Sequence, residues 1–147
     1  MNMELTPETL DEFRERFGTL HDAVIHQVEY EIFVPKPLRK LRVIVGARDW
    51  KAPTKDNWIN LTFEIEGVSN VIIKSSWNHS IAVIFETHIG FFDGEIFLDF
   101  FPASLDPSNP DKYMEISKER HVYLVVVGKK CLLHTSPYKT IINQQEQ

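Results

Sequence analysis

The spacing of apolar side chains near the start of the chain predicts a helix. The positions that recur at helical spacing are Leu10, Phe13 and Phe17. Thr6 and Pro7 are residue types that commonly open a helix, and Gly18 is typical of a helix end. We therefore expect a helix that starts at Thr6, ends before Gly18 and buries its apolar stripe.

After this helix, apolar and polar side chains alternate in short runs, which is the pattern of half-buried strands. The runs expected to form strands and hairpins cover residues 22–34, 38–47, 58–67, 71–77, 80–89, 87–100, 112–119 and 120–136. The clearest alternation is in 58–67, where apolar residues occupy every second position. Short turns between most runs indicate antiparallel pairing.

One helix and seven to nine strands imply an α+β domain. The helix stripe must be buried, and a sheet is the only large surface available to cover it. We therefore expect an N-terminal helix packed on a curved, mostly antiparallel sheet of seven to nine strands. A β-sandwich or partial barrel with the helix as a lid is the alternative. The length of 147 residues predicts a single domain over 1–147, frayed from about residue 140 to 147.

The segment 87–100 predicts a tight hairpin with a defined register. Asp93 and Gly94 suit a two-residue type I′ turn, which needs positive φ at both positions. With this turn, His88 lies directly opposite Asp99, and Glu86 lies on the same face. The other face of the hairpin is then almost wholly apolar, which supports the register.

This register makes His88, Asp99 and Glu86 the candidate catalytic residues. A histidine held by a carboxylate can act as a general base or supply part of a metal site. A cross-strand His–Asp pair is also common sheet chemistry, worth about 0.2–1 kcal/mol. Because no nucleophile is linked to the pair by sequence, the structural interpretation is favoured over the catalytic one.

His26 and Cys131 are predicted to be core residues, while His121 and His134 are expected on a polar, partly exposed sheet face and His21 at the junction of helix and strand. His26 falls on the apolar face of the first expected strand, and Cys131 falls on the apolar face of a hairpin whose turn is Gly128 and Lys129. The histidines lack the spacing of a zinc site, and no glycine-rich phosphate loop is present. We therefore expect no metal and no cofactor.

The net charge of −5 is unevenly distributed along the chain. Residues 1–34 and 58–111 are acidic, whereas residues 35–57 and 112–147 are basic. The acidic balance argues against a nucleic-acid partner and is compatible with a basic protein partner. Trp50 lies in the basic part and could touch nucleic acid, but the alternation beside it favours an edge or surface strand.

Cysteine usage and hydropathy predict a cytoplasmic protein. The single cysteine rules out an internal disulfide, which fits a reducing compartment. No apolar run reaches about 18 residues, and the first residues lack the pattern of a signal peptide. We expect no membrane association, while the oligomeric state has no sequence signal.

The run "FRERFGTLHDAVIHQVEYE", residues 13–31, resembles the opening of several small bacterial families. Some of these are uncharacterised domains, and others are grouped with immunity proteins of polymorphic toxin systems. The resemblance implies a bacterial cytosolic protein that binds another protein. It carries no established catalytic residues, so no role is transferred to His21 or Asp22 in the "HDA" motif.

Two functional hypotheses follow. The first is a non-enzymatic protein-binding module of immunity type that uses an acidic surface and exposed aromatic residues. The second is an enzyme or small-ligand-binding domain that uses the sheet face of Glu86, His88 and Asp99. A concave pocket lined by those three residues would favour the second hypothesis, and a separate acidic patch would favour the first.

Overall fold

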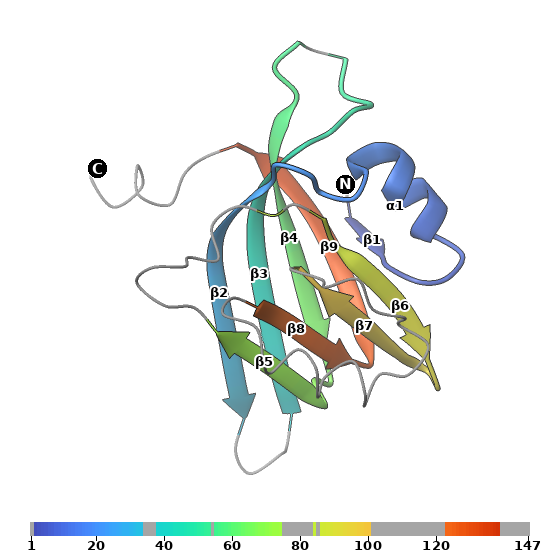
Figure 1. Ribbon diagram of the computed structural model, residues 1–147, viewed down its shortest axis with the longest axis vertical. Helices are drawn as coiled ribbons and strands as arrows, with labels where there is room; N and C mark the ends of the chain where they lie inside the picture. The colour runs from blue at the N-terminus through green and yellow to red at the C-terminus, as the bar shows by residue number, and fades with distance from the viewer. Residues whose placement is uncertain are drawn as a thin grey trace, which may run out of the picture.

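The computed structural model describes residues 2–33, 38–53, 55–74, 84, 86–100 and 123–138. In chain order, the elements are β1 (Asn2–Glu4), α1 (Leu10–Phe17), β2 (Val24–Phe33), β3 (Leu38–Arg48), β4 (Trp58–Glu66), β5 (Asn70–Lys74), β6 (His88–Phe92), β7 (Glu95–Asp99), β8 (Tyr123–Gly128) and β9 (Lys130–Pro137) (Figure 1). The strand expected in 112–119, most of the strand expected in 80–89 and the fraying expected in 140–147 lie outside the described residues.

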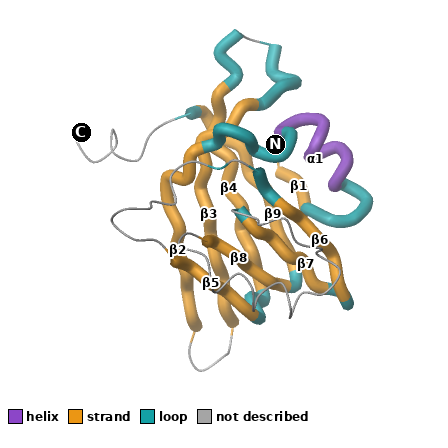
Figure 2. Tube along the Cα trace, viewed as in Figure 1, coloured by secondary structure: helices purple, strands orange, loops and turns teal. Residues whose placement is uncertain are grey.

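The described strands form two antiparallel sheets that lie as two layers (Figures 1 and 2). One sheet has five strands in the order β1-β9-β4-β3-β2, and the other has four in the order β5-β8-β7-β6. The antiparallel α+β character is confirmed, but a single sheet of seven to nine strands is wrong. A helix of eight residues is too small to cover the apolar face of so large a sheet, and the second sheet covers it instead.

The core lies between the two sheets. The five-stranded sheet contributes Leu41, Val43, Val45, Leu61, Phe63, Ile65, Cys131 and Leu133, and the four-stranded sheet contributes Ile96, Leu98, Leu124 and Val126. All twelve side chains are buried, and each large apolar side chain contributes roughly 1.5–3 kcal/mol by leaving water. The alternation predicted for 58–67 is therefore confirmed on β4, whose apolar side faces the other layer.

Helix α1 begins at Leu10, later than the sequence predicts. Thr6 and Thr9 form a separate turn before it, in which the backbone N–H of Thr6 donates to Oγ1 of Thr9 at 2.8 Å. The predicted apolar stripe is confirmed, because Phe13 is buried and its ring lies 6.0 Å from that of Phe63 on β4. The helix is thereby attached to the core through the five-stranded sheet.

The hairpin predicted for the end of the chain is wrong. β8 pairs with β5 and β7, whereas β9 pairs with β1 and β4, so the two strands belong to different sheets. Lys129 alone separates them. A Cβ on Gly128 would overlap the side chain of Ile65, so glycine permits the close approach of the layers at this corner. Cys131 is buried, as expected.

Candidate functional site

The hairpin of β6 and β7 forms with the register that the sequence predicts. His88 is paired with Asp99, and the turn residues Asp93 and Gly94 have φ values of 49° and 77°. Positive φ at both positions is the requirement that identified the turn from the sequence. Pairing of the two candidate residues across the hairpin is therefore confirmed.

The side chains of this face are not arranged as a catalytic triad. Nε2 of His88 lies 3.6 Å from Oε1 of Glu86, while Nδ1 of His88 is buried and has no hydrogen-bond partner among the described residues. Asp99 is fully buried, so a substrate in solvent does not reach it. A general base must be held in position by hydrogen bonds, and the ring of His88 is not held in this way here. A catalytic role for these three residues stays a prediction.

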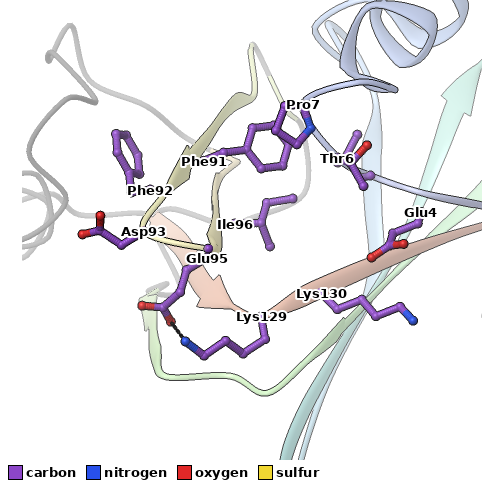
Figure 3. A pocket seen from close by; sticks show the side chains of 12 residues that line it. Glu4, Thr6, Pro7, Phe91, Phe92, Asp93, Glu95, Ile96, Lys129 and Lys130 are labelled. Atoms are coloured by element: carbon purple, nitrogen blue, oxygen red, sulfur yellow. Dashed lines mark ion pairs between the residues drawn. The ribbon is translucent and has the colours of Figure 1, made fainter.

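A shallow groove lies beside the turn of the same hairpin (Figure 3). It is lined by Glu4, Leu5, Thr6, Pro7, Phe91, Phe92, Asp93, Gly94, Glu95, Ile96, Lys129 and Lys130. Its volume is about 260 Å³, below the roughly 300–1,000 Å³ of typical ligand sites. Lys129 and Glu95 on its rim form an ion pair of 3.8 Å, and Glu86, His88 and Asp99 are not among its lining residues.

The most distinctive surface is a row of aromatic and cationic side chains at one end of the five-stranded sheet. This aromatic row consists of His26, Tyr138, Trp58, Arg48 and Trp50. Ring centroids lie 5.7 Å apart for His26 and Tyr138 and 5.8 Å apart for Tyr138 and Trp58. The guanidinium carbon of Arg48 lies 5.2 Å from the ring centroid of Trp58 and 5.5 Å from that of Trp50. Trp50 is 60% exposed and Tyr138 is 41% exposed.

A β-bulge places His26 in this row, so its predicted position on the apolar face of the strand is wrong. The register between β2 and β3 shifts between Ile25 and Gln27, which reverses the direction of the side chain between them. Gly46 makes room for the result, because an added Cβ would lie 2.6 Å from ring atoms of both His26 and Tyr138. Burial lowers the pKa of His26, whose Nε2 has no hydrogen-bond partner in the part of the chain that the structure describes.

A buried ion pair fixes helix α1 beside the aromatic row. Nε and Nη2 of Arg16 donate to Oδ2 of Asp49 at 3.0 and 2.7 Å, and the backbone N–H of Lys51 donates to Oδ1 at 3.1 Å. The backbone N–H of Trp50 donates to the carbonyl of Arg16 at 2.9 Å. Lys51 in turn binds Glu15 of the helix at 2.9 Å. The connection between β3 and β4 is therefore held to the helix at several points.

The outer face of the five-stranded sheet carries more carboxylates than cations. This acidic ladder consists of Glu29, Glu31, Lys40, Arg42, Glu64 and Glu66, which occupy paired positions on β2, β3 and β4. Glu64 is central, with Lys40 and Arg42 each 3.3 Å away. Burial alone would raise the pKa of Glu64, but hydrogen bonds from Lys40 and Arg42 lower it overall. Lys130 of β9 and Glu4 of β1 continue this face beside the ladder and cancel each other, so the four carboxylates and two cations of the ladder leave the face negatively charged.

Three comparisons with known proteins identify no relative of this chain. No protein-family model matches the sequence, and neither curated proteins nor solved structures give a significant match. Among the described residues, no cluster of three or more His, Cys, Asp and Glu side chains could hold a metal ion. None of the described helices is long and apolar enough to cross a bilayer.

Sequence reasoning identified the hairpin pair but missed the aromatic row. The row joins β2, β3, β4 and the residue after β9, which are far apart in the sequence. Two signals were nevertheless present. Trp50 and Trp58 flank a polar connection, and Arg48 lies on the polar side of an alternating strand that pairs with the strand of Trp58.

Proposed function

We propose that this chain is a protein-binding module of immunity type that holds a basic protein partner on the outer face of its five-stranded sheet. The observation that carries the proposal is the aromatic row, in which Trp50 and Tyr138 are exposed, at the opposite end of the sheet face that carries the acidic ladder. Tryptophan, tyrosine and arginine are the residues that most often dominate the energy of protein interfaces. The negatively charged ladder on the same sheet attracts a basic partner to this face of the molecule.

The way in which the row is supported also favours a binding role. Asp49 holds the neighbouring backbone in place through Arg16 and the N–H of Lys51, and Gly46 leaves the space in which the rings of His26 and Tyr138 pack. A surface that is rigid before binding loses less conformational freedom on association. Exposed tryptophan with a fixed backbone is therefore suited to an anchor in an interface.

The test is affinity capture with three variants of the immobilised protein. We expect wild type to retain a basic protein from extracts of the source cells at low salt, and to release it as salt rises. Trp50→Ala and Glu31→Lys should both reduce the retained amount. Glu86→Lys is the matched control, because it makes the same charge change beside His88 on the other sheet.

Two outcomes would contradict the proposal. Equal recovery of the same proteins by wild type, Trp50→Ala and Glu31→Lys would show that the outer face of the five-stranded sheet is not the binding surface. Loss of the partner in Glu86→Lys alone would indicate that the partner binds the sheet face of His88 instead. The immunity role has a separate test, in which expression of the captured protein should arrest growth and co-expression of this chain should restore it.

A further inference from the structure

We propose that Arg48 binds a carboxylate side chain of the partner. This inference rests on the proposed function and names the chemical group that the aromatic row recognises. It makes Arg48 a specificity residue, which fixes how a partner is oriented after the acidic ladder has attracted it.

Among the described arginines, Arg48 is the one that is held against two aromatic rings, although Arg14 and Arg39 also form no ion pair with a described residue. Arg16 binds Asp49, and Arg42 binds Glu29 and Glu64. Arg48 is exposed and forms no ion pair and no side-chain hydrogen bond with another described residue. It is therefore a cation whose hydrogen-bond donors remain available to a partner.

The aromatic contacts hold Arg48 without using those donors. Both contacts are cation–π interactions, in which the guanidinium is attracted to the face of an indole ring. The N–H groups of a guanidinium form a planar fork that matches two carboxylate oxygens. An exposed arginine is ordinarily free to move, but Trp50 and Trp58 limit its conformations before a ligand arrives. A carboxylate would then form two charge-assisted hydrogen bonds at a low entropic cost.

The surrounding charges favour a carboxylate on a protein over the phosphates of a nucleic acid. Nucleic-acid affinity depends on several lysines or arginines that neutralise successive phosphates. Close to the row, the charge of Arg16 is matched by Asp49 and that of Lys51 is matched by Glu15. The acidic ladder on the same face repels a polyanion. A basic protein that presents one carboxylate would be attracted by the acidic ladder and would bind Arg48 through that carboxylate.

The experiment uses two lysine-rich peptides that differ only at one central position, which is glutamate or glutamine. We expect wild type to bind the glutamate peptide about tenfold more tightly, which corresponds to about 1.4 kcal/mol. Calorimetric titration measures both affinities. Arg48→Met keeps much of the side-chain length and should bind the two peptides equally. Arg48→Lys should keep only part of the preference, because an ammonium lacks the planar fork.

A second measurement is independent of the variants. The Nε–H resonance of Arg48 in wild type should shift on addition of the glutamate peptide and remain in place with the glutamine peptide. Circular dichroism of Arg48→Met is compared with wild type, so that loss of structure is recognised. If that variant is unfolded, the resonance of the wild-type protein decides.

Several outcomes would overturn the assignment of Arg48. These are equal binding of the two peptides by wild type, a glutamate preference that persists in Arg48→Met, and no binding of the glutamate peptide. Tighter binding of a single-stranded oligonucleotide than of the glutamate peptide would instead assign the row to phosphates. Equal binding of both peptides that is weakened by Glu31→Lys would overturn the role of Arg48 while leaving the proposed function intact.

Discussion

Replacing Asp49 by asparagine tests whether the buried ion pair holds α1 against the β3–β4 connection. The side chain of Asp49 is 6% exposed and that of Arg16 is 25% exposed. Asparagine keeps an oxygen that can accept from the backbone of Lys51, but it removes the charge that Arg16 faces. Removing one member of a fully buried pair costs about 3–5 kcal/mol. Because water reaches Arg16 in part, we expect a smaller loss of about 2 kcal/mol, within the range for hydrogen bonds to charged groups.

Urea unfolding followed by tryptophan fluorescence measures this loss. With a slope of about 2 kcal/mol per molar urea, the midpoint should fall by about 1 M while the slope stays unchanged. Glu15→Gln is the control, because it breaks the exposed pair between Glu15 and Lys51, whose side chains are 65% and 57% exposed. Exposed pairs contribute little, so this control should leave the midpoint near that of wild type.

The pH dependence of the stability difference between wild type and Asp49→Asn gives a second check. Burial by itself would raise the pKa of Asp49, but hydrogen bonds from Arg16 and from the backbone of Lys51, with the charge of Arg16, lower it overall. A carboxyl with a lowered folded-state pKa stabilises fully above its unfolded-state pKa of about 4, and this stabilisation is lost as pH falls through the folded-state value. The gap between wild type and Asp49→Asn should therefore narrow in acid. Equal midpoints at neutral pH, or a gap that widens in acid, would refute the reasoning.

Three further predictions concern the core and the hairpin. Burial raises the pKa of Cys131, so its thiol should resist a disulfide reagent at mild alkaline pH until urea unfolds the chain, and fast labelling of the folded protein would contradict its position. Gly94→Ala should lower stability by about 1–2 kcal/mol in thermal unfolding, because a side chain is strained at a φ of 77°. No atom lies near enough to clash with the added methyl group, so the loss measures the backbone strain alone, and an unchanged transition would show that the turn tolerates a side chain. A double-mutant cycle between His88 and Asp99 should give a coupling below about 1 kcal/mol, and a larger value would indicate a tighter pair than sheet contact provides.

Features set by neighbouring residues were predictable from the sequence, as the β6–β7 hairpin illustrates. A two-residue turn at Asp93 and Gly94 fixes every pair along both strands, so the position of His88 opposite Asp99 followed directly. The alternation in β4 likewise identified the side that is buried. In both cases the decisive signal lies within about a dozen residues.

Features that depend on which strands become neighbours were not predictable in this way. From the sequence, Gly128 could be part of a hairpin turn or of a corner between two sheets. Only the packing of Ile65 against it shows that it lies at a corner. A bulge at His26 reverses which face the side chain occupies without any change in the residue pattern that precedes it. β1 covers only three residues and has too short a pattern to be recognised.

The position of β9 inside the five-stranded sheet has a consequence for synthesis on the ribosome. β9 lies between β1 and β4, although it is the last strand of the described chain. The hydrogen bond between Asn2 and His134 joins positions 132 residues apart. β2, β3 and β4 can pair as they emerge, but β1 lacks its pairing partner until β9 has been translated. Such a high contact order predicts slow folding once β9 has been synthesised, and until then chaperones would find unpaired edges on β1 and β4.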